Sequence, residues 1–136
     1  MKIKRSTELS LPGTFYQLIE KEIIDVGKPD EDAKRITLNF LDPGYCAQTG
    51  GYHPVNVGLV KNMNEWRLVS ISDYAYQDSS NDLVKEIEIC FTTNKAYSMF
   101  TGWLDSGDSQ ELLSMLINNF VEYYAMGVYR TAAYID

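Results

Sequence analysis

The sequence predicts an α+β fold in which an antiparallel β-sheet of about five to seven strands packs with an N-terminal and a C-terminal helix. Short stretches of alternating apolar and polar residues follow one another through residues 35–103, a pattern typical of half-buried strands. Turn-rich segments separate these stretches, and short connections imply antiparallel pairing. Apolar residues at helical spacing flank the strands on both sides, so one helix is expected before the sheet and one near its end.

The first helix is predicted to begin after Pro12 and Gly13, with Thr14 as its N-terminal cap. It is expected to end near Gly27, because the polar segment 28–32 contains a proline that cannot continue a helix. The apolar positions that recur at helical spacing are Phe15, Leu18, Ile19 and Ile23.

The first predicted strand, residues 35–40, alternates strictly between apolar and polar side chains. Residues 42–54 contain turn residues at both ends and are predicted to form a loop. Residues 55–59 and 66–73 are predicted to be two strands of a hairpin. The second of these mixes apolar residues on both faces, so either both faces are covered or a bulge shifts its register.

Residues 77–82 predict a further turn before a strand over residues 86–91, whose outer face would carry Glu86 and Glu88. Another strand is predicted across residues 96–103. Alternating acids on a strand usually form its solvated face, which outweighs a glycosidase-like carboxylate pair at Glu86 and Glu88.

The second helix is predicted after a capping pair formed by Asp108 and Glu111, and Gly127 is expected to terminate it. Its apolar stripe predicts that it packs on the sheet. Residues 128–135 are rich in β-branched and aromatic side chains and predict a last strand. The predicted stripe contains Leu112, Leu113, Leu116, Ile117, Phe120, Val121 and Tyr124.

The length of 136 residues suits a single domain spanning residues 1–136, and the chain shows no repeat or long linker. The net charge of −7 opposes attraction to nucleic acid or to anionic membranes and favours a basic or neutral protein partner. The sequence shows no export signal and no apolar run near the ~20 residues that cross a bilayer. Two widely separated cysteines favour reduced thiols, so we expect a cytoplasmic protein.

The one histidine, His53, shares the long loop with Cys46, so a Cys–His enzyme would have to use this pair. Sequence proximity alone does not place the thiol and the imidazole within hydrogen-bond reach. Zinc sites built from thiolates and imidazoles need more such ligands than this chain offers in one region, and no phosphate-binding motif is present. We therefore predict no metal and no cofactor.

Tyrosines gather near the loops and suggest a surface for a protein partner, because amphipathic aromatic side chains are enriched at protein interfaces. Uncovered aromatic surface and strand edges also suggest a homo-oligomer, either a dimer or a trimer. The predicted partner surface comprises Tyr45, Tyr52, His53, Tyr74, Tyr76, Glu86 and Glu88.

Three stretches together carry a family resemblance: residues 50–55 (GGYHPV), 70–76 (SISDYAY) and 119–129 (NFVEYYAMGVY). They resemble an uncharacterised gammaproteobacterial family found on pathogenicity islands and other mobile elements. The resemblance implies a fold similar to that of the mitochondrial acidic matrix protein, a curved antiparallel sheet with terminal helices. The mammalian relative of that protein binds the globular heads of a complement component and forms a trimer, which implies a binding protein rather than an enzyme.

These observations give a leading hypothesis and two alternatives. The leading hypothesis is a non-enzymatic acidic protein-interaction module, associated with mobile elements or virulence, that uses its loops and sheet edges. The first alternative is a small enzyme that depends on Cys46 and His53. The second is an acidic mimic of nucleic acid that captures DNA-binding proteins, which predicts steep salt sensitivity.

Overall fold

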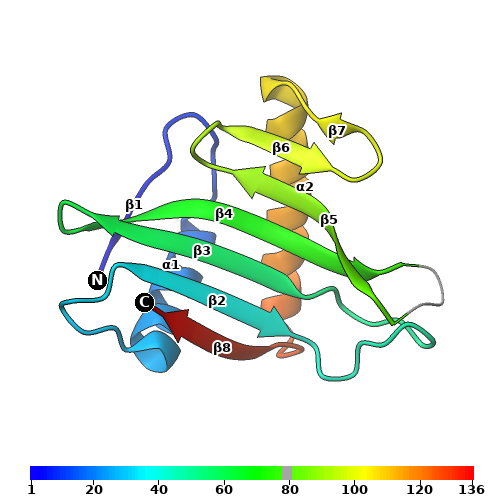
Figure 1. Cartoon of the computed structure of the whole chain (residues 1–136), viewed down its shortest axis with the longest axis horizontal. Coiled ribbons are helices and arrows are strands. Elements are labelled where there is room, and N and C mark those ends of the chain that lie inside the picture. Colours follow the sequence, from blue (N-terminus) through cyan, green and yellow to red (C-terminus); the bar gives the residue numbers. More distant parts are fainter. Residues whose placement is uncertain (78–80) are drawn as a thin grey trace.

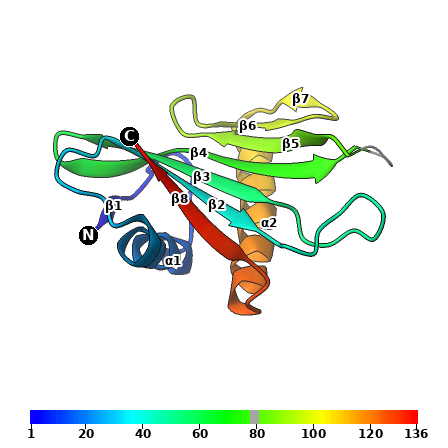
Figure 2. The same cartoon turned by 60° about the horizontal axis from the view of Figure 1, so that its bottom comes forward.

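In the computed structural model, which describes residues 1–77 and 81–136, eight strands form one curved sheet and two helices cover the same face of it (Figure 1). The opposite face carries no helix among the described residues, as the turned view shows (Figure 2). The predicted α+β class and the helix at each end are thus confirmed. The strand number is slightly above the predicted range.

The main path of the sheet has the order β7-β6-β5-β4-β3-β2-β8, and neighbours along it pair antiparallel. Chain neighbours lie side by side except that the last strand, β8, returns to the edge beside β2. The strands are β2 (Arg35–Leu41), β3 (Val55–Asn62), β4 (Glu65–Tyr76), β5 (Leu83–Cys90), β6 (Lys95–Ser98), β7 (Gly102–Trp103) and β8 (Arg130–Ile135).

A short strand that the sequence analysis missed, β1 (Ile3–Lys4), pairs with β4 in parallel. Ile3 lies opposite Trp66, whereas the pairing of β4 with β5 begins only at Ser70. The two-residue strand therefore covers a length of β4 that β5 does not reach. A segment this short carries too few residues to show a strand period in the sequence.

The first helix, α1 (Gly13–Glu22), continues as a π-helical turn, η1 (Ile23–Gly27), so its predicted end near Gly27 is confirmed. The predicted cap at Thr14 is wrong, because Pro12 occupies the cap position and no side chain caps this end. Pro12 suits this place because a proline has no backbone N–H to satisfy.

The second helix, α2 (Ser106–Ala125), begins before the predicted capping pair. The side chain of Asp105 accepts a hydrogen bond of 2.8 Å from the backbone N–H of Asp108. The prediction that Asp108 and Glu111 form the cap is therefore wrong by one turn. Two acids within a few residues each satisfy the sequence signature of a cap, and only the backbone path decides between them.

The hydrophobic core fills the space between the sheet and the two helices. The alternation predicted for residues 35–40 is confirmed, because Ile36, Leu38 and Phe40 of β2 are all buried in this core. Aromatic rings from several elements meet there, with the Phe40 and Phe120 rings 4.9 Å apart. The core includes Phe15, Ile19, Ile36, Leu38, Phe40, Val57, Ile71, Ile89, Leu113, Ile117 and Phe120.

The mixed faces of β4 are explained by a β-bulge, one of the two predicted alternatives. Gly58 pairs with Ser70 and Leu59 with Leu68, so Val69 is an extra residue on β4. The extra residue reverses the alternation on its two sides. The hairpin of β3 and β4 is confirmed, and its turn places Met63 and Asn64 at positive φ.

Three further predicted boundaries can be compared with the structure. The strand predicted across residues 96–103 is divided, because the chain turns after β6 and returns as β7. The last strand begins at Arg130 rather than at residue 128. The predicted turn 77–82 is closed by a backbone hydrogen bond from Gln77 to Asp82, while residues 78–80 lie outside the described part.

None of the helices in residues 1–77 and 81–136 is long and apolar enough to span a membrane.

Candidate functional site

A second break in strand pairing, between β4 and β5, turns Glu86 toward the helices. Asp73 pairs with Ile87, but the next residue, Tyr74, pairs with Lys85. Glu86 is therefore an extra residue on β5 with no residue opposite it on β4. Bulges of this kind bend a strand and redirect a side chain, and they are frequent beside functional sites.

The bulge separates the two acids that were predicted to share one strand face. Glu86 lines a pocket together with residues of α2 and the buried Ile87, so the prediction that it points outward is wrong. Glu88 remains on the outer face, where its carboxylate accepts a hydrogen bond of 2.9 Å from the Lys85 ammonium. Strand alternation gave the wrong direction for the Glu86 side chain because β5 has one residue more than β4 at this point.

The loop between β2 and β3 is organised by the carboxylate of Asp42. This carboxylate accepts hydrogen bonds from the backbone N–H groups of Gly44, at 2.9 Å, and Tyr52, at 3.0 Å. Gly51 approaches it so closely that an added Cβ would lie 2.8 Å from the Asp42 carboxylate and 2.9 Å from the Cα of Tyr45. Only glycine fits at this position, where φ is +138°. The contacts with Asp42 therefore fix the backbone of the loop that positions His53.

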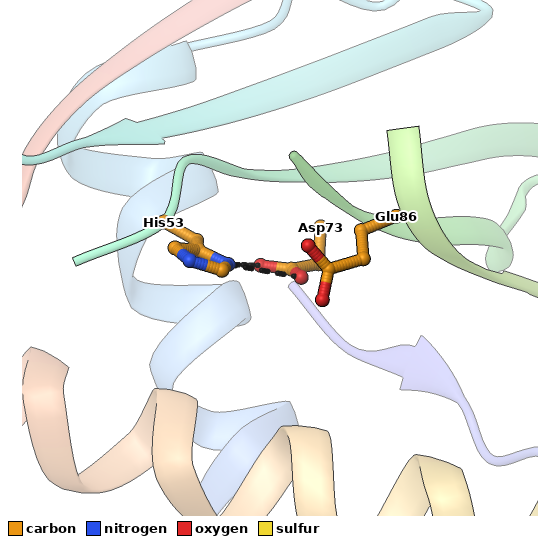
Figure 3. A group of neighbouring side chains, drawn as sticks. All are labelled: His53, Asp73 and Glu86. Carbon is orange, nitrogen blue, oxygen red and sulfur yellow. Dashed lines mark hydrogen bonds and ion pairs between the residues drawn. The ribbon is translucent and has the colours of Figure 1, made fainter. Parts of the chain in front are cut away.

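His53 lies against Asp73, and Glu86 lies beside them (Figure 3). The imidazole Nδ1 is 3.3 Å from each of the two carboxylate oxygens of Asp73. Asp73 is only 6% exposed, whereas His53 and Glu86 are half-buried. One ligand atom from each of the three side chains lies within 4.8 Å of the others. The hydrogen bond to Asp73 raises the pKa of His53 above its usual value.

These three side chains line a partly open pocket of about 340 Å³ between the sheet and α2. Phe120 and Leu116 of α2 form an apolar wall. Tyr129 lies between α2 and β8 and also lines the pocket, and burial raises the pKa of its phenol. The described residues that line the pocket include no Lys or Arg. Among these lining residues, His53 is the one side chain that can carry a positive charge.

Four tyrosines stand around this end of the sheet, and we call them the tyrosine rim: Tyr45, Tyr52, Tyr76 and Tyr123. The Tyr45 ring lies 5.0 Å from that of Tyr76 and 5.5 Å from that of His53. The hydroxyl of Tyr45 also accepts a 2.9 Å hydrogen bond from the backbone N–H of Tyr76. The Tyr52 and Tyr123 rings are 4.5 Å apart and join the loop to α2. The rim thus unites three segments that are distant in sequence.

Cys46 has its own partner in the same loop. Its sulfur lies 2.8 Å from the hydroxyl of Thr49 and accepts a hydrogen bond of 3.4 Å from the Thr49 backbone N–H. The side-chain hydrogen bond with Thr49 lowers the pKa of this thiol. Both of these hydrogen bonds join the thiol to Thr49, and neither joins it to the imidazole of His53.

Comparison with known proteins places the chain in a family. A family model for proteins of unknown function, DUF2787, matches residues 13–133. The chain belongs to the DUF2787 family. This confirms the resemblance found in the sequence. No curated protein matches the chain.

Two solved structures resemble this DUF2787 protein over nearly its whole length. The hypothetical protein VC0508 from the VSP-II pathogenicity island of Vibrio cholerae has a TM-score of 0.88 and 24% identity, covering 100% of this chain and 99% of its own. The hypothetical protein VC1805 from pathogenicity island VPI-2 of the same organism has a TM-score of 0.81 and 24% identity, covering 94% and 97%. VC1805 is described as sharing structural homology with the human P32 protein. At this identity the likeness establishes the fold.

The structure brings together only part of the partner surface predicted for this DUF2787 chain. Three of its residues, Tyr52, His53 and Glu86, line the pocket. The Tyr45 ring lies against the rings of His53 and Tyr76. Neither Tyr74 nor Glu88 lines the pocket, and Glu88 alternates with buried neighbours on β5 and points outward.

Sequence analysis missed Asp73 and Tyr123 as site residues. Asp73 ends the segment whose mixed faces had already indicated a bulge, and that irregularity was the available signal. Tyr123 belongs to a tyrosine pair at the end of α2, and nothing in its sequence context shows that it meets the loop.

Proposed function

We propose that this DUF2787 protein is a non-enzymatic interaction module that binds a basic segment of a protein partner on the tyrosine rim. The observation that carries the proposal is the assembly of two tyrosine pairs from a loop, a strand and a helix. Tyr52 and Tyr123 line the pocket, and the ring of Tyr45 lies against that of His53. Tyrosine combines a large apolar surface with a polar tip and few rotatable bonds, so it is common among the residues that dominate binding energy.

The charge of the molecule supports a basic partner. The chain carries a net charge of −7, and the pocket beside the rim contains Asp73 and Glu86 without a lysine or arginine among its described lining residues. A positive segment would be attracted over a distance of about 8 Å at physiological salt. Salt would therefore weaken binding chiefly by slowing association.

One feature of the similar structures and one feature of the loop support this proposal. Both similar structures come from pathogenicity islands, which supports a process tied to mobile elements. The hydrogen bonds of the Cys46 thiol go to Thr49 and not to His53, which favours binding over thiol catalysis.

The test is capture of partners from a native bacterial lysate by tagged protein, washed at low and then at high salt, with bound species identified by mass spectrometry. The rim variant is Tyr52→Ser combined with Tyr123→Ser. The control is Tyr97→Ser combined with Trp103→Ser, which removes another aromatic pair, 5.4 Å apart, at the β7 edge of the sheet.

We expect wild type and control to retain the same basic protein, and the rim variant to retain at least about tenfold less. Circular dichroism establishes that both variants are folded. Equal retention by the rim variant would overturn the proposal, as would loss in the control alone. A captured set consisting of several unrelated DNA-binding proteins, all released at high salt, would replace it with nucleic-acid mimicry.

A further inference from the structure

We propose that His53, Asp73 and Glu86 form a binding site for a divalent transition-metal ion, with Zn²⁺ as the best fit. This inference goes beyond the docking of a partner on the tyrosine rim and does not depend on it. It rests on three side chains from the loop, β4 and β5 that point toward one another on the inner face of the sheet (Figure 3).

The distances suit an ion. Zinc binds imidazole nitrogen and carboxylate oxygen at about 2.0–2.2 Å, so two ligands in tetrahedral geometry lie about 3.3–3.5 Å apart. The Nδ1 of His53 already stands 3.3 Å from both oxygens of Asp73, which is longer than a usual hydrogen bond. A carboxylate oxygen of Glu86 lies within 4.8 Å of the other two ligand atoms, and closer approach of this flexible side chain would complete three ligands.

The ligand types determine the class of ion. One imidazole and two carboxylates match zinc and related first-row ions, whereas Mg²⁺ and Ca²⁺ prefer oxygen ligands alone. Three protein ligands leave a fourth tetrahedral position, which would face the pocket. The sequence predicted no zinc site because its thiolates and imidazoles are too few, whereas this cluster adds two carboxylates to the imidazole.

The electrostatics of the pocket also favour a cation. Asp73 is 6% exposed and lies near a second carboxylate, and like charges that are close together and shielded from water repel strongly. The described lining residues supply no lysine or arginine. A divalent ion would neutralise both carboxylates at once, and it would compete for them with a basic segment of a partner.

The backbone provides an independent reason to regard the cluster as a built site. Glu86 reaches the pocket only because the bulge on β5 interrupts the alternation that would place it outside. Bulges redirect side chains and are over-represented beside functional sites. Without it, the pocket would contain two of the three ligands.

The test is isothermal titration calorimetry of tag-free protein with ZnCl₂. We expect wild type to bind one Zn²⁺ ion per chain. Glu86→Gln keeps the shape of the side chain and removes its charge, and it should weaken binding at least about tenfold. The matched control is Glu88→Gln on the same strand, whose carboxylate lies on the outer face, and it should bind like wild type.

Two further variants test the imidazole ligand and the thiol in the same loop. His53→Gln should weaken Zn²⁺ binding as strongly as Glu86→Gln, and circular dichroism shows whether each variant keeps its fold. Cys46→Ser should leave binding unchanged. Tighter binding of Co²⁺ than of Mn²⁺ or Mg²⁺ is also expected from the order of affinities for such ligands.

The inference is overturned if wild type binds no stoichiometric ion, if folded Glu86→Gln or His53→Gln binds as wild type does, or if Cys46→Ser abolishes binding. Capture of the protein partner is carried out with a chelator present. Failure of the metal site therefore leaves the docking proposal to its own test.

Discussion

β2 and β5 show the same alternation in sequence but take different roles in the fold. In β2, Ile36, Leu38 and Phe40 are all buried, and residues 35–40 pair with β3 in unbroken register. β5 has an extra residue at Glu86, so an acid that should face solvent enters the pocket. The regular strand builds the core, and the interrupted strand builds the candidate site.

The difference shows that alternation fixes the direction of a side chain only when the neighbouring strand has a matching residue. In β2 the register with β3 agrees with the alternation of apolar residues, so the strand contributes a continuous row of side chains to the core. In β5 they disagree, and a charged side chain is placed where a core would not accept it. Local conflict of this type is expected at functional sites.

The largest expected effect is on the free energy of unfolding and concerns the regular strand, β2. Phe40 is fully buried and lies 4.9 Å from the Phe120 ring. Phe40→Ala should lower the free energy of unfolding by about 3–5 kcal/mol, since it removes apolar contacts and leaves a cavity. Urea denaturation measures this, with Asn39→Ala as the control at about 0.5 kcal/mol. Glu86→Gln should behave like the control. A loss as large as that of Phe40→Ala would show that the bulge serves stability.

A smaller effect is expected at the loop that positions His53. Gly51→Ala places a Cβ 2.8 Å from the Asp42 carboxylate at a φ of +138°. We expect a loss of about 3 kcal/mol and weaker Zn²⁺ binding, because the loop must move. Gly50→Ala, at a φ of +74° with nothing within 4 Å, should cost about 1 kcal/mol and spare the site. Equal results for the two glycines in denaturation and titration would contradict a loop fixed by Asp42.

The contact between the two helices should show a pH dependence. Tyr124 of α2 donates a hydrogen bond to the buried Glu22 of α1, and burial followed by this bond raises the pKa of Tyr124 to about 12. Between pH 10 and about 12 the unfolded chain loses this proton while the folded chain keeps it, so stability should fall as pH rises.

Tyr124→Phe should cost about 2 kcal/mol at pH 7, because Glu22 loses its donor. Its free energy of unfolding should then fall less steeply above pH 10 than that of wild type. Tyr134→Phe, at a side chain that is 63% exposed, is the control and should follow wild type. Identical slopes for wild type and Tyr124→Phe would show that this pair is not linked to folding.

The smallest effect concerns the thiol and should not alter stability. Because Thr49 supplies the hydrogen bonds that lower the pKa of Cys46, Thr49→Val should raise that pKa toward its ordinary value. His53→Gln should leave it unchanged. Alkylation rates against pH, in a Cys90→Ser background, measure both. A shift in His53→Gln would restore the case for a Cys–His enzyme.

The regular elements of this protein could be predicted because they depend on patterns within one segment. The alternation of β2 and the apolar stripe of α2 place their side chains without reference to the rest of the chain. The turn chemistry of residues 42–54 likewise predicted the long loop between β2 and β3.

The elements that were missed depend on partners elsewhere. β1 exists only because β5 stops short and exposes an edge of β4. The break between β6 and β7 depends on the turn over residues 99–101, which leads into Gly102 at a φ of +81°. The local spacing of apolar residues predicts neither the free edge of β4 nor the turn between β6 and β7.

The sequence by itself determined the α+β class, the main strands, both helices and the negative charge, because each follows from local periodicity or from composition. The tertiary structure alone decided that His53, Asp73 and Glu86 meet. His53 and Asp73 stand 20 positions apart, and their encounter depends on the fold of the loop. Glu86 joins them through a bulge, which is a property of two paired strands together and cannot be read from either one.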